Sequence, residues 1–307
     1  MSKSRFAIAA LVLLGAALWL LTPARLEYAA GAQLPALPAS PAIAGTEERV
    51  LRTVDPGNAR WVVVALHGFS ASRQETAPLA ETVAQQLGAN LVEVRLSGHG
   101  LAENPLAGVR AEHWLNDAQK AFSTAAELGE RIIVIGTSTG ATLTAALLDQ
   151  DFASHIDTLV MISPNFAPRD PKAKWLTRPA GPLIAQLVAG DTRCWTPTND
   201  LQDQYWSNCY PMAAAVEMMR LVDRANRILP ADISQRLLMF YSPDDKVISP
   251  DAALEIFEAT GSPMKKAIEI RDPGDPSHHV LAGDILSPAK TREIADAIID
   301  FIERPIP

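Results

Sequence analysis

A serine stands between two glycines in the stretch GTSTG at residues 136–140. An apolar, β-branched run at 132–135 precedes this stretch, and a run typical of a helix follows it at 141–148. Where a chain turns this tightly from a buried strand into a helix, the serine takes a strained conformation, and the glycines remove side chains that would collide. An ordinary turn also favours serine and glycine, but the flanking strand and helix favour the interpretation that Ser138 is a nucleophile.

An aliphatic hydroxyl is a weak nucleophile until a neighbouring base takes its proton, and two later stretches offer the groups required. Residues 242–248 (SPDDKVI) contain the adjacent carboxylates Asp244 and Asp245. Residues 276–280 (PSHHV) contain the adjacent imidazoles of positions 278 and 279. Histidine suits the base because its unperturbed pKa lies near working pH, and a carboxylate behind it would fix the tautomer of the ring.

Apolar runs alternate with helical patterns along the chain from residue 49 onward. Near-continuous apolar runs are typical of strands covered on both faces, and strands that alternate with helices predict a parallel sheet with right-handed crossovers. The predicted strands are 49–54, 61–66, 90–96, 131–135, 158–162, 236–241 and 266–271, and the predicted helices are 73–87, 111–128, 140–148, 250–259 and 288–302. We expect the acidic side chains of Glu112 and Asp117 to lie on the solvent face of their helix.

Four stretches make the chain resemble the α/β-hydrolases: LHGFSAS from residue 66, GTSTG from 136, YSPDDKVISP from 241 and SHHVLAGD from 277. Within the α/β-hydrolases, the chain resembles the branch of carboxylesterases, monoacylglycerol lipases and lysophospholipases. The resemblance covers the chain from Val50 to the C-terminus. It implies an α/β-hydrolase fold, with a mostly parallel central sheet, helices on both faces and an inserted helical cap. The core would comprise residues 49–163 and 234–307, and the cap residues 164–233.

The same resemblance selects one histidine and one acid. The family places its catalytic histidine directly before a short aliphatic run, which favours His279 as the base over His278. It places the acid two residues before a buried aliphatic side chain, here Val247, which favours Asp245 over Asp244. Asp244 would then shape the turn.

The resemblance also supplies an oxyanion hole for a reaction at Ser138. The backbone N–H groups of Phe69 and Thr139 would donate to the developing negative charge. His67, in the stretch HGF, would brace that turn rather than act as a second base. His99, in the Gly-His-Gly turn that many relatives carry, would be structural as well.

The predicted cap is rich in proline, tryptophan and methionine and contains both cysteines of the chain. We expect it to lie over the carboxyl ends of the strands, where ligands of open α/β sheets bind. Most of Trp175, Trp195 and Trp206 should be core, and some could line a pocket for an acyl chain. Cys194 and Cys209 are a disulfide candidate in an exported protein, whereas a reducing cytosol would keep them as thiols.

The N-terminal segment has a different composition from the rest of the chain. Residues 1–5 carry two positive charges and residues 6–21 carry no charge, a pattern typical of a signal peptide or of an uncleaved membrane anchor. We expect residues 1–28 to form this segment, favouring an anchor, and residues 29–48, rich in alanine and proline, to be a linker. The domain would then lie on the periplasmic side of an inner membrane, or be secreted if the segment is cleaved.

Composition excludes one class of partner. The net charge of −8 and the lack of a basic stripe argue against nucleic acid, and no ligand spacing implies a metal or a cofactor. The sequence therefore predicts a serine hydrolase that cleaves carboxylic esters, lipidic ones above all, through an acyl-enzyme. Thioesterase, acyltransferase, amidase and cofactor-free haloperoxidase chemistry are alternatives on the same fold, and a non-catalytic binding module is a further one.

Overall fold

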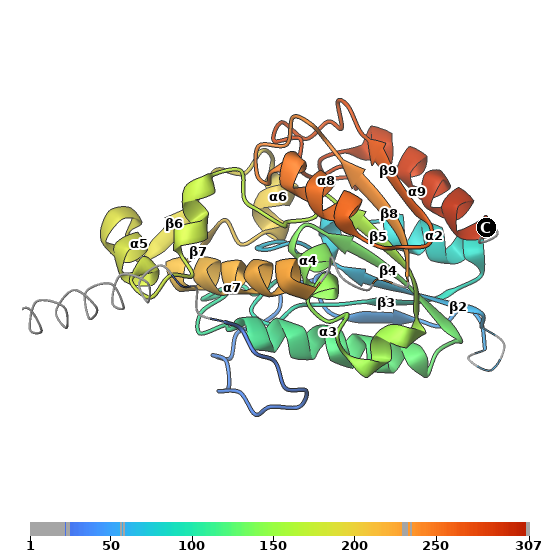
Figure 1. Ribbon diagram of the computed structural model, residues 1–307, viewed down its shortest axis with the longest axis horizontal. Helices are drawn as coiled ribbons and strands as arrows, with labels where there is room; N and C mark the ends of the chain where they lie inside the picture. Colours follow the sequence, from blue (N-terminus) through green and yellow to red (C-terminus); the bar gives the residue numbers. More distant parts are fainter. Residues whose placement is uncertain are drawn as a thin grey trace, which may run out of the picture.

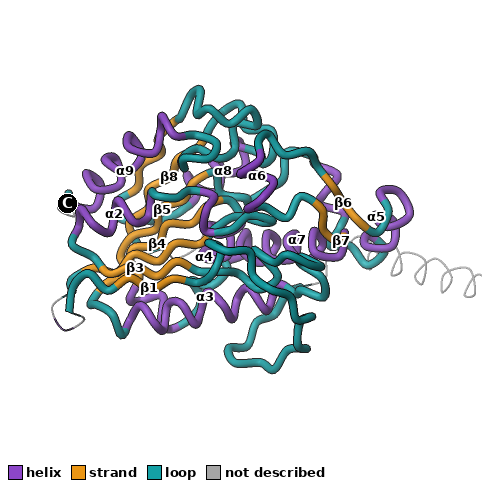
Figure 2. Tube along the Cα trace, turned by 180° about the vertical axis from the view of Figure 1, so that it is seen from behind, coloured by secondary structure: helices purple, strands orange, loops and turns teal. Residues whose placement is uncertain are grey.

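The structure is a computed structural model that describes Thr22, residues 25–55, Gly57, residues 59–228, Ile233 and residues 235–304. A seven-stranded sheet runs through the centre, and helices cover both of its faces (Figure 1). A smaller lobe of helices and a short hairpin lies at one end of the molecule, on the opposite side from the end of the chain (Figure 2). The predicted architecture, a mostly parallel sheet between two layers of helices, is confirmed.

All seven predicted strands are present, with ends shifted by up to three residues. They are β1 (Arg49–Leu51), β2 (Trp61–Leu66), β3 (Asn90–Glu93), β4 (Arg131–Thr137), β5 (Ile156–Ile162), β8 (Arg236–Tyr241) and β9 (Lys265–Glu269). Their order in the sheet is β1-β3-β2-β4-β5-β8-β9. Every neighbouring pair is parallel except β1 and β3, so β1 is an antiparallel edge strand.

The helices of the core also lie where the sequence predicts them. They are α2 (Leu79–Leu87), α3 (Ala111–Ala126), α4 (Thr139–Ala145), α8 (Pro250–Ala259) and α9 (Pro288–Glu303). The predicted helix 73–87 is in fact two pieces, a 3-10 turn at Arg73–Glu75 and then α2. Pro78 stands between them, where a residue without an N–H group interrupts no helical hydrogen bond.

Strand side chains alternate between two buried clusters, one on each face of the sheet. Val62 and Val64 of β2 pack in the cluster that includes α3, α4 and α8. Trp61 and Val63 pack in the cluster that includes α2 and α9. Because both faces are apolar, the sequence of β2 is a continuous apolar run, as expected for a strand with helices on both sides.

The strand order reverses between β2 and β4. The chain leaves β2 toward β3 on one side and returns to β4 on the other, so the loops that follow β2 and β4 diverge. Open α/β sheets bind their ligands at the carboxyl ends of the strands at such a switch point. The HGF stretch follows β2 and the GTSTG stretch spans the end of β4, so the fold places both at this point.

The lobe corresponds to the predicted cap. It contains α5 (Gly181–Ala189), α6 (Asp200–Tyr205), α7 (Met212–Ile228) and a hairpin of two three-residue strands, β6 (Thr192–Cys194) and β7 (Cys209–Pro211). The sequence indicated no strand here, because three residues are too few to show an alternating pattern. Within the hairpin Cys194 and Cys209 are paired and joined by the expected disulfide.

The cap tryptophans are less uniformly buried than expected. Trp206 is buried, Trp195 is half-buried and Trp175 is 49% exposed. The prediction of a solvent-facing acidic pair on α3 is wrong. Glu112 forms an ion pair with Arg220 of α7, and Asp117 accepts a backbone N–H at 2.6 Å. Both carboxylates therefore hold neighbouring segments to α3.

The described chain begins to pack on the domain before the predicted linker. Leu26 is fully buried in the cluster that includes α3, and its carbonyl accepts hydrogen bonds from Arg224 and Arg227 of α7 at 3.3 Å each. The Tyr28 hydroxyl donates to Asn116 of α3 at 2.8 Å. Residues 1–21, which hold the uncharged run of the predicted anchor, lie outside the described residues, and the domain boundaries remain predictions. No helix in the described part of the chain is both long and apolar enough to cross a membrane.

Candidate active site

Ser138 occupies the turn between β4 and α4 with backbone angles of φ 50° and ψ −113°. Non-glycine residues rarely take a positive φ, so this backbone is strained. The flanking glycines make the turn possible. A Cβ atom at Gly140 would lie 2.1 Å from the Leu66 carbonyl oxygen, and one at Gly136 would lie 2.7 Å from the nitrogen of Ala141. The close contact with Leu66 brings the serine turn against the end of β2.

His279 and Asp245 lie together although 34 residues separate them in sequence. The distance between His279 Nδ1 and Asp245 Oδ2 is 2.8 Å, and both side chains are buried. Asp245 Oδ1 accepts the backbone N–H groups of Val247 at 2.7 Å and Ile248 at 2.9 Å. Since a carboxylate only accepts, the ring nitrogen that faces it carries the proton, and Nε2 of the neutral ring is left with a free lone pair.

The residues next to Asp245 and His279 lie as expected except for the aliphatic side chain after the acid. Val247, expected to be the buried aliphatic residue after the acid, is 46% exposed, and Ile248 at 1% is the buried one. Asp244 is exposed, whereas Asp245 is buried. His278 has a left-handed backbone with φ 54°, and it is the ring of the next residue that contacts Asp245.

The charges around His279 favour its protonated form. Burial alone would lower the pKa of this imidazole. Together, the charge and hydrogen bond of Asp245 and the charges of the Glu75 and Asp275 carboxylates outweigh burial, so the pKa of His279 is raised. A base that gains a proton during a reaction benefits from such surroundings.

Asp275, which the sequence did not single out, shapes the loop that carries His279. Its carboxylate accepts the backbone N–H groups of Ser277 at 3.1 Å, His279 at 3.0 Å and Val280 at 2.9 Å. Burial alone would raise the pKa of Asp275, but these donors and the Ser277 hydroxyl lower it. A turn signal, aspartate followed by proline and serine, was present in the sequence, but it does not reveal which residue the turn positions.

Consecutive residues at the end of β5 hold both the serine turn and the histidine loop. The Ile162 carbonyl accepts the Ser138 N–H at 2.8 Å. The hydroxyl of the next residue, Ser163, donates to the His279 carbonyl at 2.7 Å. The backbones of Ser138 and His279 are therefore fixed to one strand end, while a hydrogen bond between the Ser138 hydroxyl and His279 Nε2 remains a prediction.

Two buried histidines brace the turn that follows β2. His67 Nε2 accepts the Leu96 N–H at 3.2 Å, so its Nδ1 donates to the Gly68 carbonyl at 2.9 Å. His99 Nε2 accepts the Ser70 N–H at 3.1 Å. Burial lowers the pKa of His67 to about 4 and also lowers that of His99, so both rings are neutral at pH 7. Their contacts are structural, as the sequence predicted.

The predicted oxyanion donors lie on the two turns that meet here. Thr139 is the first residue of α4, and the first N–H groups of a helix have no acceptor within it. Phe69 packs edge-on against Trp114 of α3 and Tyr210 of the cap, with ring centroids 5.9 and 4.9 Å apart. Its ring is therefore anchored, although whether its N–H and that of Thr139 receive an oxyanion remains a prediction.

Glu75 is a second residue that the sequence missed. It is only 3% exposed, and its carboxylate accepts the Gly68 N–H at 2.6 Å. Burial raises the pKa of Glu75 to about 7, against the opposing effects of the Gly68 N–H and His279. Its position was hidden because it ends a short 3-10 turn within a stretch predicted to be one amphipathic helix.

The cap closes over this arrangement. The N–H of Ser207 donates to the Ser70 carbonyl at 2.6 Å. Trp206 packs in a small apolar cluster with Ala71 and Val280, which adjoin the turn after β2 and the histidine loop. Among the described residues, no group of three His, Cys, Asp or Glu side chains could hold a metal ion.

Fold and site together define the class. A structure reported for LipS and LipT, two metagenome-derived lipolytic enzymes, superimposes with a TM-score of 0.71 at 22% identity, covering 85% of this chain and 99% of that one. The monoacylglycerol lipase of Paleococcus ferrophilus superimposes with a TM-score of 0.61 at 16% identity, covering 83% and 98%. The chain has the α/β-hydrolase fold, as predicted.

The family is defined by sequence. Residues 57–274 match the hydrolase family described as serine aminopeptidase, S33, and the chain belongs to that family. A thermostable monoacylglycerol lipase from Bacillus sp. (strain H-257) is 25% identical over 226 residues, which make up 74% of this chain and 85% of that protein. The chain is thus an α/β hydrolase homologous to monoacylglycerol lipases and esterases.

Proposed function

We propose that this protein is a serine hydrolase that cleaves carboxylic esters through an acyl-enzyme on Ser138. The proposal is supported by the strained turn at Ser138 and by the buried, hydrogen-bonded His279–Asp245 pair. Consecutive residues at the end of β5 hold the backbones of Ser138 and His279. A serine nucleophile with an imidazole whose second nitrogen is fixed by a carboxylate is the arrangement that serine hydrolases of unrelated folds share. The strained turn from strand to helix is the form that the serine takes in α/β-hydrolases.

The reaction has two halves. The Ser138 hydroxyl attacks the ester carbonyl and passes its proton to His279 Nε2, while Asp245 stabilises the imidazolium that forms. The N–H groups of Phe69 and Thr139 donate to the oxyanion, where the loss of one donor typically costs about 3 kcal/mol. The imidazolium then protonates the leaving alcohol, and water that gives its proton to His279 releases the acid and restores Ser138.

Lipidic esters, such as monoacylglycerols or lysophospholipids, are the substrates that we propose. The relatives include monoacylglycerol lipases, and a lipid would reach this site from a surface. Helix α5 of the cap supports a lipid surface as the partner, because its four largest apolar side chains, Leu183, Ile184, Leu187 and Val188, are between 56% and 82% exposed. We propose further that the part of residues 1–28 that precedes Leu26 attaches the domain to the periplasmic side of an inner membrane, or directs its secretion if it is cleaved.

Replacement of Ser138 by alanine tests the reaction. We expect Ser138→Ala to abolish hydrolysis of p-nitrophenyl esters and of a lysophospholipid, and to abolish labelling by a fluorophosphonate, while the circular dichroism spectrum stays unchanged. A Ser154→Ala variant is the matched control, because Ser154 is exposed in the turn before β5. Undiminished turnover in Ser138→Ala would refute the nucleophile. Labelling without ester turnover would favour an acyltransferase, thioesterase or amidase instead.

A further inference from the structure

Glu75 lies between the two turns that the proposed reaction uses. A Cβ atom built on Gly68 would lie 2.9 Å from Glu75 Oε1 and 3.3 Å from Ser138 Cβ. The carboxyl group and the side chain of the nucleophile therefore border the same point of the turn that follows β2. Because Gly68 precedes Phe69, a group that fixes the Gly68 peptide also fixes the orientation of the proposed oxyanion donor.

The backbone of Glu75 contacts the segment that follows the histidine loop. A Cβ atom on Gly283 would lie 2.4 Å from the Glu75 carbonyl oxygen. Two residues further on, the Ala77 carbonyl accepts the N–H of Asp284 at 2.9 Å. The 3-10 turn that carries Glu75 is thus packed against the chain that leaves His279, which explains how a residue next to the turn after β2 comes to act on the imidazole.

The charged groups around this pair can be named element by element. Glu75 is subject to the charges of His279 and Asp275. His279 is subject to those of Asp245 from the loop after β8, Glu75 from the 3-10 turn and Asp275 from its own loop. Asp245 accepts two backbone N–H groups and Asp275 accepts three, whereas Glu75 accepts only that of Gly68. Glu75 is therefore the carboxyl group of the three with the fewest backbone donors.

We propose that Glu75 is a positioning residue of the active site, with two separable actions. Its carboxyl group holds the Gly68 peptide and so shapes the turn after β2, which carries the proposed oxyanion donor Phe69. Its negative charge, when present, favours the protonated form of His279. The role of Glu75 in catalysis rests on the proposed function. Both actions, however, take place in the protein without substrate and can be measured there.

A histidine titration by NMR separates the two actions. In Glu75→Gln, the amide oxygen still accepts the Gly68 N–H, but the charge is gone. We expect the titration midpoint of the His279 imidazole, assigned with a His279→Gln variant, to fall by about one pH unit in the full-length protein, since two charges near one another in a buried site interact by at least this much. The control is Asp117→Asn, which removes a carboxyl that also accepts a backbone N–H at 2.6 Å but that does not act on His279.

The wild-type protein supplies a test that does not depend on any variant. Because Glu75 has a pKa of about 7, its ionisation should appear as a second step in the titration of the His279 signals. A single step in the wild type, or an unchanged midpoint in Glu75→Gln, would overturn the proposal. A midpoint that falls equally in Asp117→Asn would also overturn it, because the shift would then not be specific to Glu75.

A kinetic measurement adds the link to catalysis. The acidic limb of the pH profile of kcat/KM for a p-nitrophenyl ester should move to lower pH in Glu75→Gln, whereas a residue with a purely structural role would lower kcat/KM without moving the limb. If the wild type hydrolyses no ester, the proposed function fails and the NMR result still decides the effect of Glu75 on His279. If the wild type is active and the limb stays in place, the inference alone fails.

Discussion

Besides Asp245, two buried carboxyl groups act on His279, Glu75 and Asp275, and their environments move their pKa values in opposite directions. Asp275 accepts three backbone N–H groups and one hydroxyl, and its pKa is lowered although burial alone would raise it. Glu75 accepts one backbone N–H, and burial prevails, so its pKa is raised. The number of donors aimed at each carboxylate thus decides which one stays charged in the folded protein.

The raised pKa of Glu75 makes a prediction about stability. A group whose pKa is raised by folding contributes stability that is complete below its unfolded value, 4.5, and that is lost as pH rises through its folded value, about 7. Wild type should therefore lose stability relative to Glu75→Gln across this window, with a difference of about 3 kcal/mol at pH 8. Urea unfolding of both proteins at several pH values measures it.

The control for this experiment is Glu255→Gln, which changes an exposed carboxylate on α8. Its free energy of unfolding should follow that of wild type throughout the range. A difference between wild type and Glu75→Gln that stays constant from pH 4.5 to pH 8 would show that Glu75 is ionised in the folded state over the whole range.

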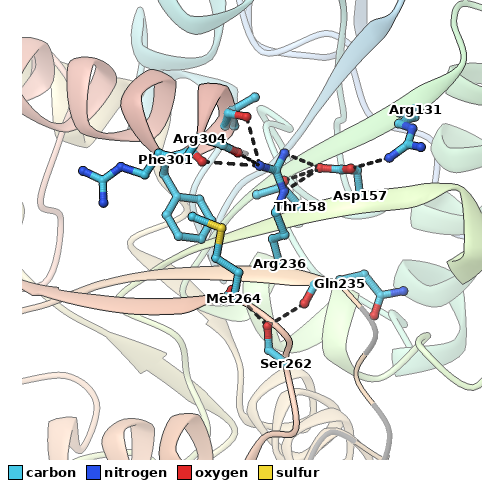
Figure 3. A network of polar contacts seen from close by, with 10 residues as sticks. Arg131, Asp157, Thr158, Gln235, Arg236, Ser262, Met264, Phe301 and Arg304 are labelled. Atoms are coloured by element: carbon cyan, nitrogen blue, oxygen red, sulfur yellow. Dashed lines mark hydrogen bonds and ion pairs between the residues drawn. The ribbon is translucent and has the colours of Figure 1, made fainter. Parts of the chain in front are cut away.

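At the scale of the elements, an ion pair joins strands at the end of the sheet remote from the active site (Figure 3). Asp157 of β5 accepts Arg236 Nη2 at 2.5 Å and Nε at 3.0 Å, and both side chains are buried. Arg236 also donates to the Ile302 carbonyl at 2.9 Å, near the end of α9. The pair therefore ties two strands to the last helix, whose final carbonyls lack partners within the helix.

Breaking this pair should be costly. Asp157→Asn would leave the Arg236 charge buried without its counter-charge, and we expect the free energy of unfolding to fall by about 3 kcal/mol. Arg131 pairs with the same carboxylate at 2.9 Å, but its side chain is 56% exposed, so Arg131→Gln should cost less than about 1 kcal/mol. Denaturant unfolding compares the two variants, and equal losses would contradict the role assigned to burial.

The sequence predicted those helices and strands that have a clear local pattern of apolar residues. The run at β2 and the run at β8 each gave the correct ends, because a short continuous apolar run between polar residues leaves little choice. The hairpin of β6 and β7 was missed, since its strands are short and its stability comes from a disulfide and not from a pattern. The break before α2 was missed although Pro78 was visible, because the apolar pattern continues past it.

For the whole molecule, the site residues that a sequence motif marks were predicted, and those without a motif were missed. Ser138, Asp245 and His279 were selected because motifs mark them, and the structure pairs the last two. Glu75 and Asp275 carry no motif, and their importance comes from burial and from the donors that the fold brings to them. Such effects depend on contacts between distant segments, which local sequence patterns do not encode.

The cap gives the molecule an asymmetric surface. Helix α5 contains no charged residue from Gly181 to Ala189, and Figures 1 and 2 show it at the far end of the cap. The exposed cations Lys172 and Lys174 precede it and Arg193 follows it, and the exposed acids Asp170 and Asp191 lie in the same flanking segments. An apolar helix flanked by cations suits the surface of an anionic lipid layer, where the apolar side chains enter the interface and the cations meet the headgroups.

This surface makes the last prediction, which concerns how substrate is reached and not how it is cleaved. The double variant Leu187→Asp, Val188→Asp places two charges on the most exposed part of α5. We expect it to lower the hydrolysis of a monoacylglycerol embedded in anionic vesicles by about tenfold or more, because burying a charged side chain at the interface costs more than 1.4 kcal/mol. Hydrolysis of water-soluble p-nitrophenyl acetate should stay within twofold of wild type, since Leu187 and Val188 are exposed and do not pack against the buried Ser138 and His279.

Leu201→Asp is the matched control, because Leu201 is 49% exposed on α6 in the same cap. It should leave the ratio of the two activities unchanged. If Leu201→Asp lowers the ratio as far as the α5 variant does, the effect is a general weakening of the cap. If neither variant changes it, lipid reaches Ser138 without α5. An effect confined to α5 would mean that the cap both covers the site and orients its entrance toward the lipid.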